Sequence, residues 1–261
     1  MDFKDLSRKV KEKSKIFSFV AKDAQSGGPV AARIMMLACV FVYLIEVILN
    51  IVSRDAYGNM IRYGAANYIN TPTHPYSLLT SVFMHDLNPM HLICNMFTLL
   101  AVAPPLEKML GHARFLALYL ISGIGGNIFY LVFGDVLFRL KPESLAQSAF
   151  EYALSFSVGA SGAIFGLFGA LLVVYRRLGI DMRSMVVFVA INFSLPIFMK
   201  NISWQCHLGG FIFGGLYIWL ILIGFKPLRR KSLTFKATVY GIFLAVIMLV
   251  IFMIIYAYHK S

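Results

Sequence analysis

The sequence predicts an all-α, polytopic membrane protein, a bundle of membrane-spanning helices, and three observations lead to this fold class. Of its 261 residues, 59% are apolar and 14% are charged, whereas soluble domains are about 45–50% apolar and about 25% charged. Apolar runs of about 20 residues, the length that crosses a bilayer core, recur along the chain. These runs do not alternate with polar residues as exposed strands do.

Seven apolar segments are predicted to span the membrane. They lie near residues 31–52, 88–106, 114–134, 158–175, 184–200, 204–225 and 237–258. The fourth and fifth are short, and short or interrupted spans usually border a cavity instead of lipid. The connections 53–87 and 135–157 are long enough to fold over one end of the bundle.

The distribution of charge predicts an orientation. The chain carries 24 Lys and Arg against 12 Asp and Glu, a net charge of +12. Most of the basic residues fall at the N-terminus and in every second connection, which predicts a cytoplasmic N-terminus and an outside C-terminus. The lipid bilayer therefore accounts for the excess charge, and no nucleic-acid partner is expected. We expect a multi-pass protein of the cell membrane, most consistent with a prokaryotic plasma membrane.

Four polar side chains stand out because lipid offers them no partner. His91 and Asn95 lie in the second predicted span, Ser161 in the fourth and His207 in the sixth. These three spans run in the same direction, and each polar residue falls in the first turns of its span. The four side chains are therefore predicted to meet at one depth, just below the outer surface.

The chemistry of these residue types suits acyl transfer. The Ser161 hydroxyl, made accessible by Gly159 and Gly162, needs a base, and His207 is the candidate. His91 and Asn95 are four residues apart, on one helical face, and their N–H groups could form an oxyanion hole with the backbone N–H of Ser161. A lone Gly-Ala-Ser-Gly is also typical of helix packing in membranes. The joint pattern favours a Ser–His dyad, since no acidic residue lies at that depth in these spans.

Five segments resemble motifs of one family, the rhomboid intramembrane serine proteases, and the resemblance covers about residues 30–225. They are the serine motif at 159–166, the histidine motif at 206–210, the His-x-x-x-Asn signature at 91–96, the turn at 106–111 and the third span at 119–127. The resemblance implies a six-helix core with one additional helix and cleavage of transmembrane protein substrates near the outer face.

The resemblance also implies roles for single residues. Ser161 would be the nucleophile, His207 the general base and then acid, and His91 and Asn95 the oxyanion donors. Phe165 would stack on the catalytic histidine, although its position also suits a lipid-facing side chain. His85 would shape the region above the oxyanion hole, a structural role more than a catalytic one.

The sequence departs from the family pattern at three places. Five residues separate His85 from His91 where many relatives have four, Tyr76-Ser77 replaces the usual Trp-Arg pair, and Cys206 replaces a small alanine. These changes put the position of His85 and the packing of the preceding loop in question. Both dyad residues are retained.

Three regions are predicted on this basis. Residues 1–29 form a basic cytoplasmic segment, 30–225 the rhomboid-like protease domain, and 226–261 a basic linker with an additional transmembrane helix. No metal, nucleotide or other cofactor motif is present, so no cofactor is expected. The three cysteines form no disulfide framework, and the sequence leaves the oligomeric state open.

Two other classes stay open. The chain could be an inactive rhomboid-like protein that binds transmembrane helices, or a transporter with a proton relay of Glu46, His91 and His207. For Glu46 itself a structural hydrogen bond is the favoured interpretation. The fifth span, interrupted by Asn192, Ser194 and Pro196, is the candidate lateral gate for substrate entry.

Overall fold

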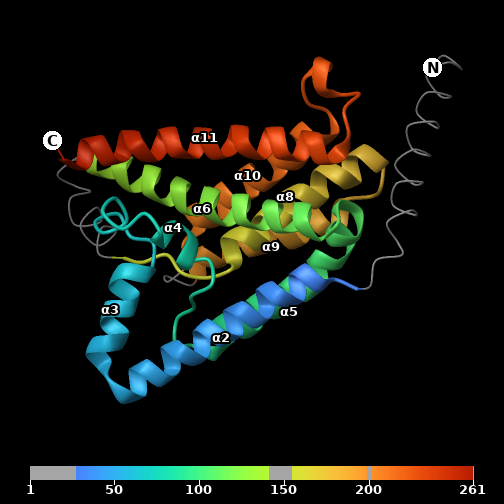
Figure 1. Ribbon diagram of the computed structural model, residues 1–261. Helices are drawn as coiled ribbons and strands as arrows, with labels where there is room; N and C mark the ends of the chain where they lie inside the picture. Colours follow the sequence, from blue (N-terminus) through green and yellow to red (C-terminus); the bar gives the residue numbers. More distant parts are fainter. Residues whose placement is uncertain (1–27, 141–154, 199–201, 261) are drawn as a thin grey trace, which may run out of the picture.

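The computed structural model describes residues 28–140, 155–198 and 202–260, and these are helices joined by turns (Figure 1). In chain order the helices are α2 (Val30–Val52), α3 (Arg54–Gly64), α4 (Ser77–Thr80), α5 (Pro89–Leu110), α6 (His112–Leu140), α8 (Ser161–Leu178), α9 (Arg183–Phe198), α10 (Trp204–Leu222), the 3-10 helix η3 (Lys226–Leu228) and α11 (Leu233–Lys260). The predicted all-α membrane bundle is confirmed. The basic segment predicted at 1–29 lies almost wholly outside the described residues.

Every predicted span is helical over most of its described residues, and the fifth is short, as predicted. Among the described residues, α2, α5, α6, α8, α10 and α11 are long and apolar enough to cross a membrane, whereas α9 is a shorter apolar helix. The interruption expected at Asn192 and Ser194 was wrong. The helix continues past both, because Asn192 Nδ2 donates to the carbonyl of Phe188 (2.8 Å) and Ser194 Oγ to that of Ile191 (2.7 Å).

Helix α5 also runs further than predicted. Asn88 caps its start by accepting a hydrogen bond from the Met90 N–H (3.1 Å), and proline at the first helical position fits there because its missing N–H has no partner to lose. The segment 106–110, expected to be a turn, is the last part of this helix, and only Gly111 leaves it. Pro104 and Pro105 lie inside the helix, as neighbouring helices in a bundle allow.

The core of the bundle consists of α6, α8 and α10, which pack most closely on one another. Helix α6 is the most buried span, while α2 and α11 are the most exposed. Figure 1 shows α11 along one edge beside α6, and α2 against α5 at the other. The face that an outer helix turns away from the bundle is apolar, as a lipid-facing surface must be.

Two buried carboxylates fix α2 at its two ends. Glu46 accepts the backbone N–H of His85 at 3.2 and 3.1 Å. Glu107 accepts the N–H groups of Ala31 (2.6 Å) and Ala32 (2.9 Å), which the first turn of a helix leaves unpaired. Glu46 therefore has a structural hydrogen bond, as expected of it.

The connection 53–87 is folded. Ser53 caps α3 by accepting the Ala56 N–H (3.2 Å), and an isolated antiparallel bridge joins Ala66 to Ser157 through hydrogen bonds of 3.1 and 2.7 Å. Where the family pattern has arginine, Ser77 is buried and its hydroxyl donates to Thr71 Oγ1 (2.9 Å). This neutral hydrogen bond ties the connection together before the chain enters α5.

Candidate active site

Ser161 and His207 are in direct contact. Ser161 is the first residue of α8, His207 lies in the first turn of α10, and Oγ of the serine is 2.9 Å from Nε2 of the histidine. A serine hydroxyl within hydrogen-bond distance of an imidazole can transfer its proton as it attacks a carbonyl. The arrangement has the geometry of a nucleophile and its base.

Glycines bring the two helices that carry this pair to backbone contact. A Cβ on Gly210 of α10 would overlap the carbonyl oxygen of Gly162 on α8, and one on Gly214 would overlap the backbone of Gly166. Only residues without a side chain permit this approach. The close crossing explains how side chains on two separate helices come within hydrogen-bond distance.

The ring of His207 is held by Phe165. The two rings are stacked, with centroids 4.1 Å apart and planes inclined by 9°. Nδ1 of His207 is buried and has no hydrogen-bond partner among the described residues. The ring is thus oriented by stacking, where a conventional triad would use a carboxylate.

His91 and Asn95 lie beside the segment that leads into Ser161. A Cβ on Gly159 would come 2.8 Å from His91 Nε2 and 3.6 Å from Asn95 Nδ2, so both nitrogens border this glycine. Gly159 has a φ of +124°, in the region that favours glycine. Asn95 Nδ2 is buried without a partner among the described residues, which leaves an N–H free to bind an incoming oxygen.

His85 and Asp86 also lie near these donors. The buried His85 ring lies 5.1 Å from that of His91. Burial, and then the neighbouring His91, lower the pKa of His85 to about 3, so this side chain is neutral at physiological pH. Asp86 Oδ2 is 3.2 Å from His91 Nδ1. It comes from the segment whose length departs from the family pattern.

Sequence reasoning missed Asn127. This buried amide on α6 donates to the Leu78 carbonyl (2.9 Å) and to Ser81 Oγ (2.8 Å), and its oxygen accepts from Ser157 Oγ (3.4 Å) and Cys206 Sγ (3.6 Å). It joins the connection 53–87, the segment that leads into Ser161 and helix α10. An amide inside a predicted span was a signal available from the sequence.

The same end of the bundle holds all the side chains singled out from the sequence. Ser161, His207 and Phe165 form one contact group, His91 and Asn95 border it at Gly159, and His85 lies one ring further away. Within the described residues, no group of three or more His, Cys, Asp or Glu side chains could hold a metal ion. Fold and site together define a multi-pass helical membrane protein with a serine–histidine pair at one end of its bundle.

The chain belongs to the rhomboid family, because the model of the Rhomboid domain matches residues 72–224. It is 32% identical over 155 residues to RHOMBOID-like protein 4 of Arabidopsis thaliana, covering 57% of this chain and 34% of that protein. It is 33% identical over 150 residues to the rhomboid protease GluP of Bacillus subtilis, covering 54% and 25%. The putative rhomboid protease YdcA of the same organism is 35% identical over 162 residues, covering 60% and 69%. The aligned part thus spans about a third of the first of these relatives.

Proposed function

We propose that the protein is an intramembrane serine endopeptidase that uses Ser161 and His207 as a catalytic dyad. The observation that carries this proposal is the 2.9 Å contact between Ser161 Oγ and His207 Nε2 inside a helical membrane bundle. Oγ attacks the scissile carbonyl while Nε2 takes its proton, and the imidazolium then protonates the leaving amine. Water, activated by the same nitrogen, hydrolyses the acyl-enzyme and restores the serine.

The charge of the tetrahedral intermediate needs N–H donors at the position where it develops. We assign this role to Asn95 Nδ2, His91 Nε2 and the backbone N–H of Ser161. The first two border Gly159, two residues before the nucleophile, and Asn95 Nδ2 has no partner among the described residues. The stacked Phe165 keeps His207 aligned during both proton transfers.

The substrate class follows from the environment of the site. A peptide bond within a transmembrane helix has both its polar groups paired, so a substrate segment must unwind locally before attack. Helix-breaking or small residues near the scissile bond lower that cost. We propose transmembrane segments of membrane proteins as substrates, cleaved near the outer face of the cell membrane. A C-terminal tag that is accessible only from outside would test the orientation.

Helix α9 is our candidate for the gate through which a substrate enters. Among the described residues it is shorter than the six helices that are long enough to cross a membrane, and its Phe193 ring packs on Phe165 (4.7 Å) and Phe211 (5.8 Å). Movement of α9 would therefore reach the ring that is stacked on His207. Cross-linking α9 to α5 should block cleavage, and unchanged cleavage would contradict the gate.

The decisive experiment uses the purified full chain in liposomes with a single-span model substrate. We expect the native chain to cleave it and the Ser161→Ala and His207→Ala variants to be inactive. Ser232→Ala, which changes an exposed serine that accepts the Phe235 N–H (3.2 Å) far from the pair, is the matched control and should keep full activity. Substrate binding without cleavage by the native chain would identify a binding protein, and equal, background cleavage by all variants would contradict the protease.

A further inference from the structure

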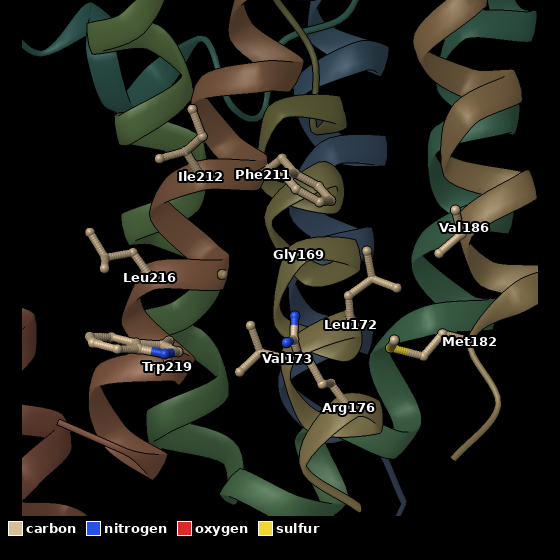
Figure 2. A pocket seen from close by; sticks show the side chains of 11 residues that line it. Gly169, Leu172, Val173, Arg176, Met182, Val186, Phe211, Ile212, Leu216 and Trp219 are labelled. Carbon is tan, nitrogen blue, oxygen red and sulfur yellow. The ribbon is translucent and has the colours of Figure 1, made fainter. Parts of the chain in front are cut away.

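A groove lies at the opposite end of α8 and α10 from the serine–histidine pair. Its volume is about 500 Å³, within the usual range of ligand pockets, about 300–1,000 Å³. Figure 2 shows its walls, formed by α8 (Val173), α10 (Leu216, Trp219) and the first turn of α9 (Val186). No residue of the candidate active site lines it.

Arg176 is the one charged residue among those that line the groove. Its side chain runs back along the groove from the last turns of α8, so its guanidinium lies beside apolar side chains (Figure 2). Neither a hydrogen bond nor an ion pair joins this guanidinium to any other described residue. Arg176 is exposed, so its guanidinium is accessible to an anionic group that enters the groove.

The charged end of the groove and its apolar walls together suit one amphiphilic ligand. Arginine binds a phosphate oxygen pair with two parallel hydrogen bonds, and no acidic side chain lines the groove to compete. A free phosphate would leave the apolar walls without contacts, whereas an acyl chain would cover them. A headgroup with net negative charge neutralises Arg176 without bringing a second cation into the groove.

We infer that this groove binds one anionic phospholipid, with its phosphate on Arg176 and an acyl chain between α9 and α10. The Arg176 end is cytoplasmic in the proposed orientation, where anionic lipids are recognised by basic pockets between membrane helices. This inference concerns a site away from Ser161 and does not rest on the protein being a protease.

The test is photolabelling of the full chain in phosphatidylcholine nanodiscs that contain phosphatidylglycerol with a diazirine on one acyl chain. We expect labelled peptides from α8, the start of α9 and α10, with competition by unlabelled phosphatidylglycerol. Arg176→Gln should lower this labelling at least about fivefold, the factor that about 1 kcal/mol per basic residue represents. Arg177→Gln is the matched control, because it removes the same charge one residue away but does not line the groove.

A second variant tests the apolar half. Val173→Trp places a large ring in the groove and should also lower the labelling, while the fold of each variant is checked by its unfolding transition. Equal labelling of Arg176→Gln and the native chain, or equal competition by phosphatidylcholine, would overturn the inference. Displacement of the lipid by inorganic phosphate alone would do so too, because it would mean that the acyl chain contributes nothing.

Discussion

Replacing Asn127 by leucine should disable the active site more than it destabilises the fold. The amide joins three segments that are far apart in sequence, and leucine has a similar size but can neither donate nor accept. Ser81, which loses its bond to Asn127 Nδ2, accepts the Gly159 N–H at 2.9 Å through its own carbonyl. The change therefore reaches the loop that leads directly into Ser161.

The loss of stability can be bounded from these contacts. Side-chain hydrogen bonds in membrane proteins contribute about 0.6 kcal/mol on average, so the two short bonds to Leu78 and Ser81 set a lower limit of about 1 kcal/mol. The Leu78 carbonyl has no other donor among the described residues, and an unpaired buried carbonyl costs about 1–3 kcal/mol. We expect a decrease of about 1–4 kcal/mol, less than the total stability of most folded proteins.

The effect on catalysis should be larger because it depends on position. A displacement of about 1 Å at a catalytic group can cost about 10²-fold in rate, so we expect kcat of Asn127→Leu to fall by about that factor with a smaller change in KM. Both constants are measured on a single-span substrate in liposomes, alongside the free energy of unfolding. A Ser81→Ala, Asn127→Leu double variant should be little worse than Asn127→Leu alone, because both remove the same bond.

Tyr240→Phe is the control for stability. The buried Tyr240 hydroxyl accepts the Phe225 N–H (2.9 Å) at the opposite end of the bundle, so its loss should lower stability without changing kcat. A kcat within threefold of native for Asn127→Leu would refute our reasoning. So would an equal fall in kcat for Tyr240→Phe, since stability alone would then explain both.

Three further predictions concern other parts of the site and its supports. Phe165→Leu should lower kcat about three- to tenfold, since an aromatic pair contributes about 0.5–1.5 kcal/mol, and Phe165→Tyr should restore it; unchanged kinetics would mean that stacking does not orient His207. Gly210→Ala should lower the free energy of unfolding by more than about 3 kcal/mol, because the added Cβ meets backbone. Gly241→Ala, whose added Cβ has contacts of 3.7 Å, should lower it by less than about 1 kcal/mol. Equal losses would contradict the close crossing. Burial and a neighbouring histidine lower the pKa of His85 from 6.5 to about 3, so below pH 6.5 the unfolded chain takes up a proton that the folded chain does not. Stability is complete above pH 6.5 and should fall by up to about 1.4 kcal/mol per unit on acidification, with a smaller slope in His85→Gln.

Hydropathy was sufficient for the membrane helices, because each must bury its backbone polar groups within itself in lipid. Hydropathy predicted least for segments that are not surrounded by lipid. Segment 106–110 was expected to be a turn because it resembles the turn after the second helix of the rhomboid family, yet it is the last part of α5, with Leu106 and Leu110 buried. Helix α3, in the connection 53–87, begins at its Ser53 cap and has no buried residue.

The candidate site was predicted to the extent that it depends on residue type and helix direction. Ser161 and His207 were expected at one depth, and they lie 2.9 Å apart. The proximity of His91 to Asp86 and the hydrogen bonds of Asn127 depend on how the connection 53–87 folds, which no periodicity encodes. Their roles in chemistry stay predictions until the variants above are measured.

The glycine crossing of α8 and α10 has a consequence for how the protein can change over evolutionary time or in a directed-evolution library. At Gly210 and Gly214 an added Cβ would overlap backbone of α8, so variation at these two positions is almost always lost. Helix α9 is the least constrained by neighbours among the described helices that are assigned to the membrane. A library confined to α9 should therefore retain far more folded members than one spread over the whole chain.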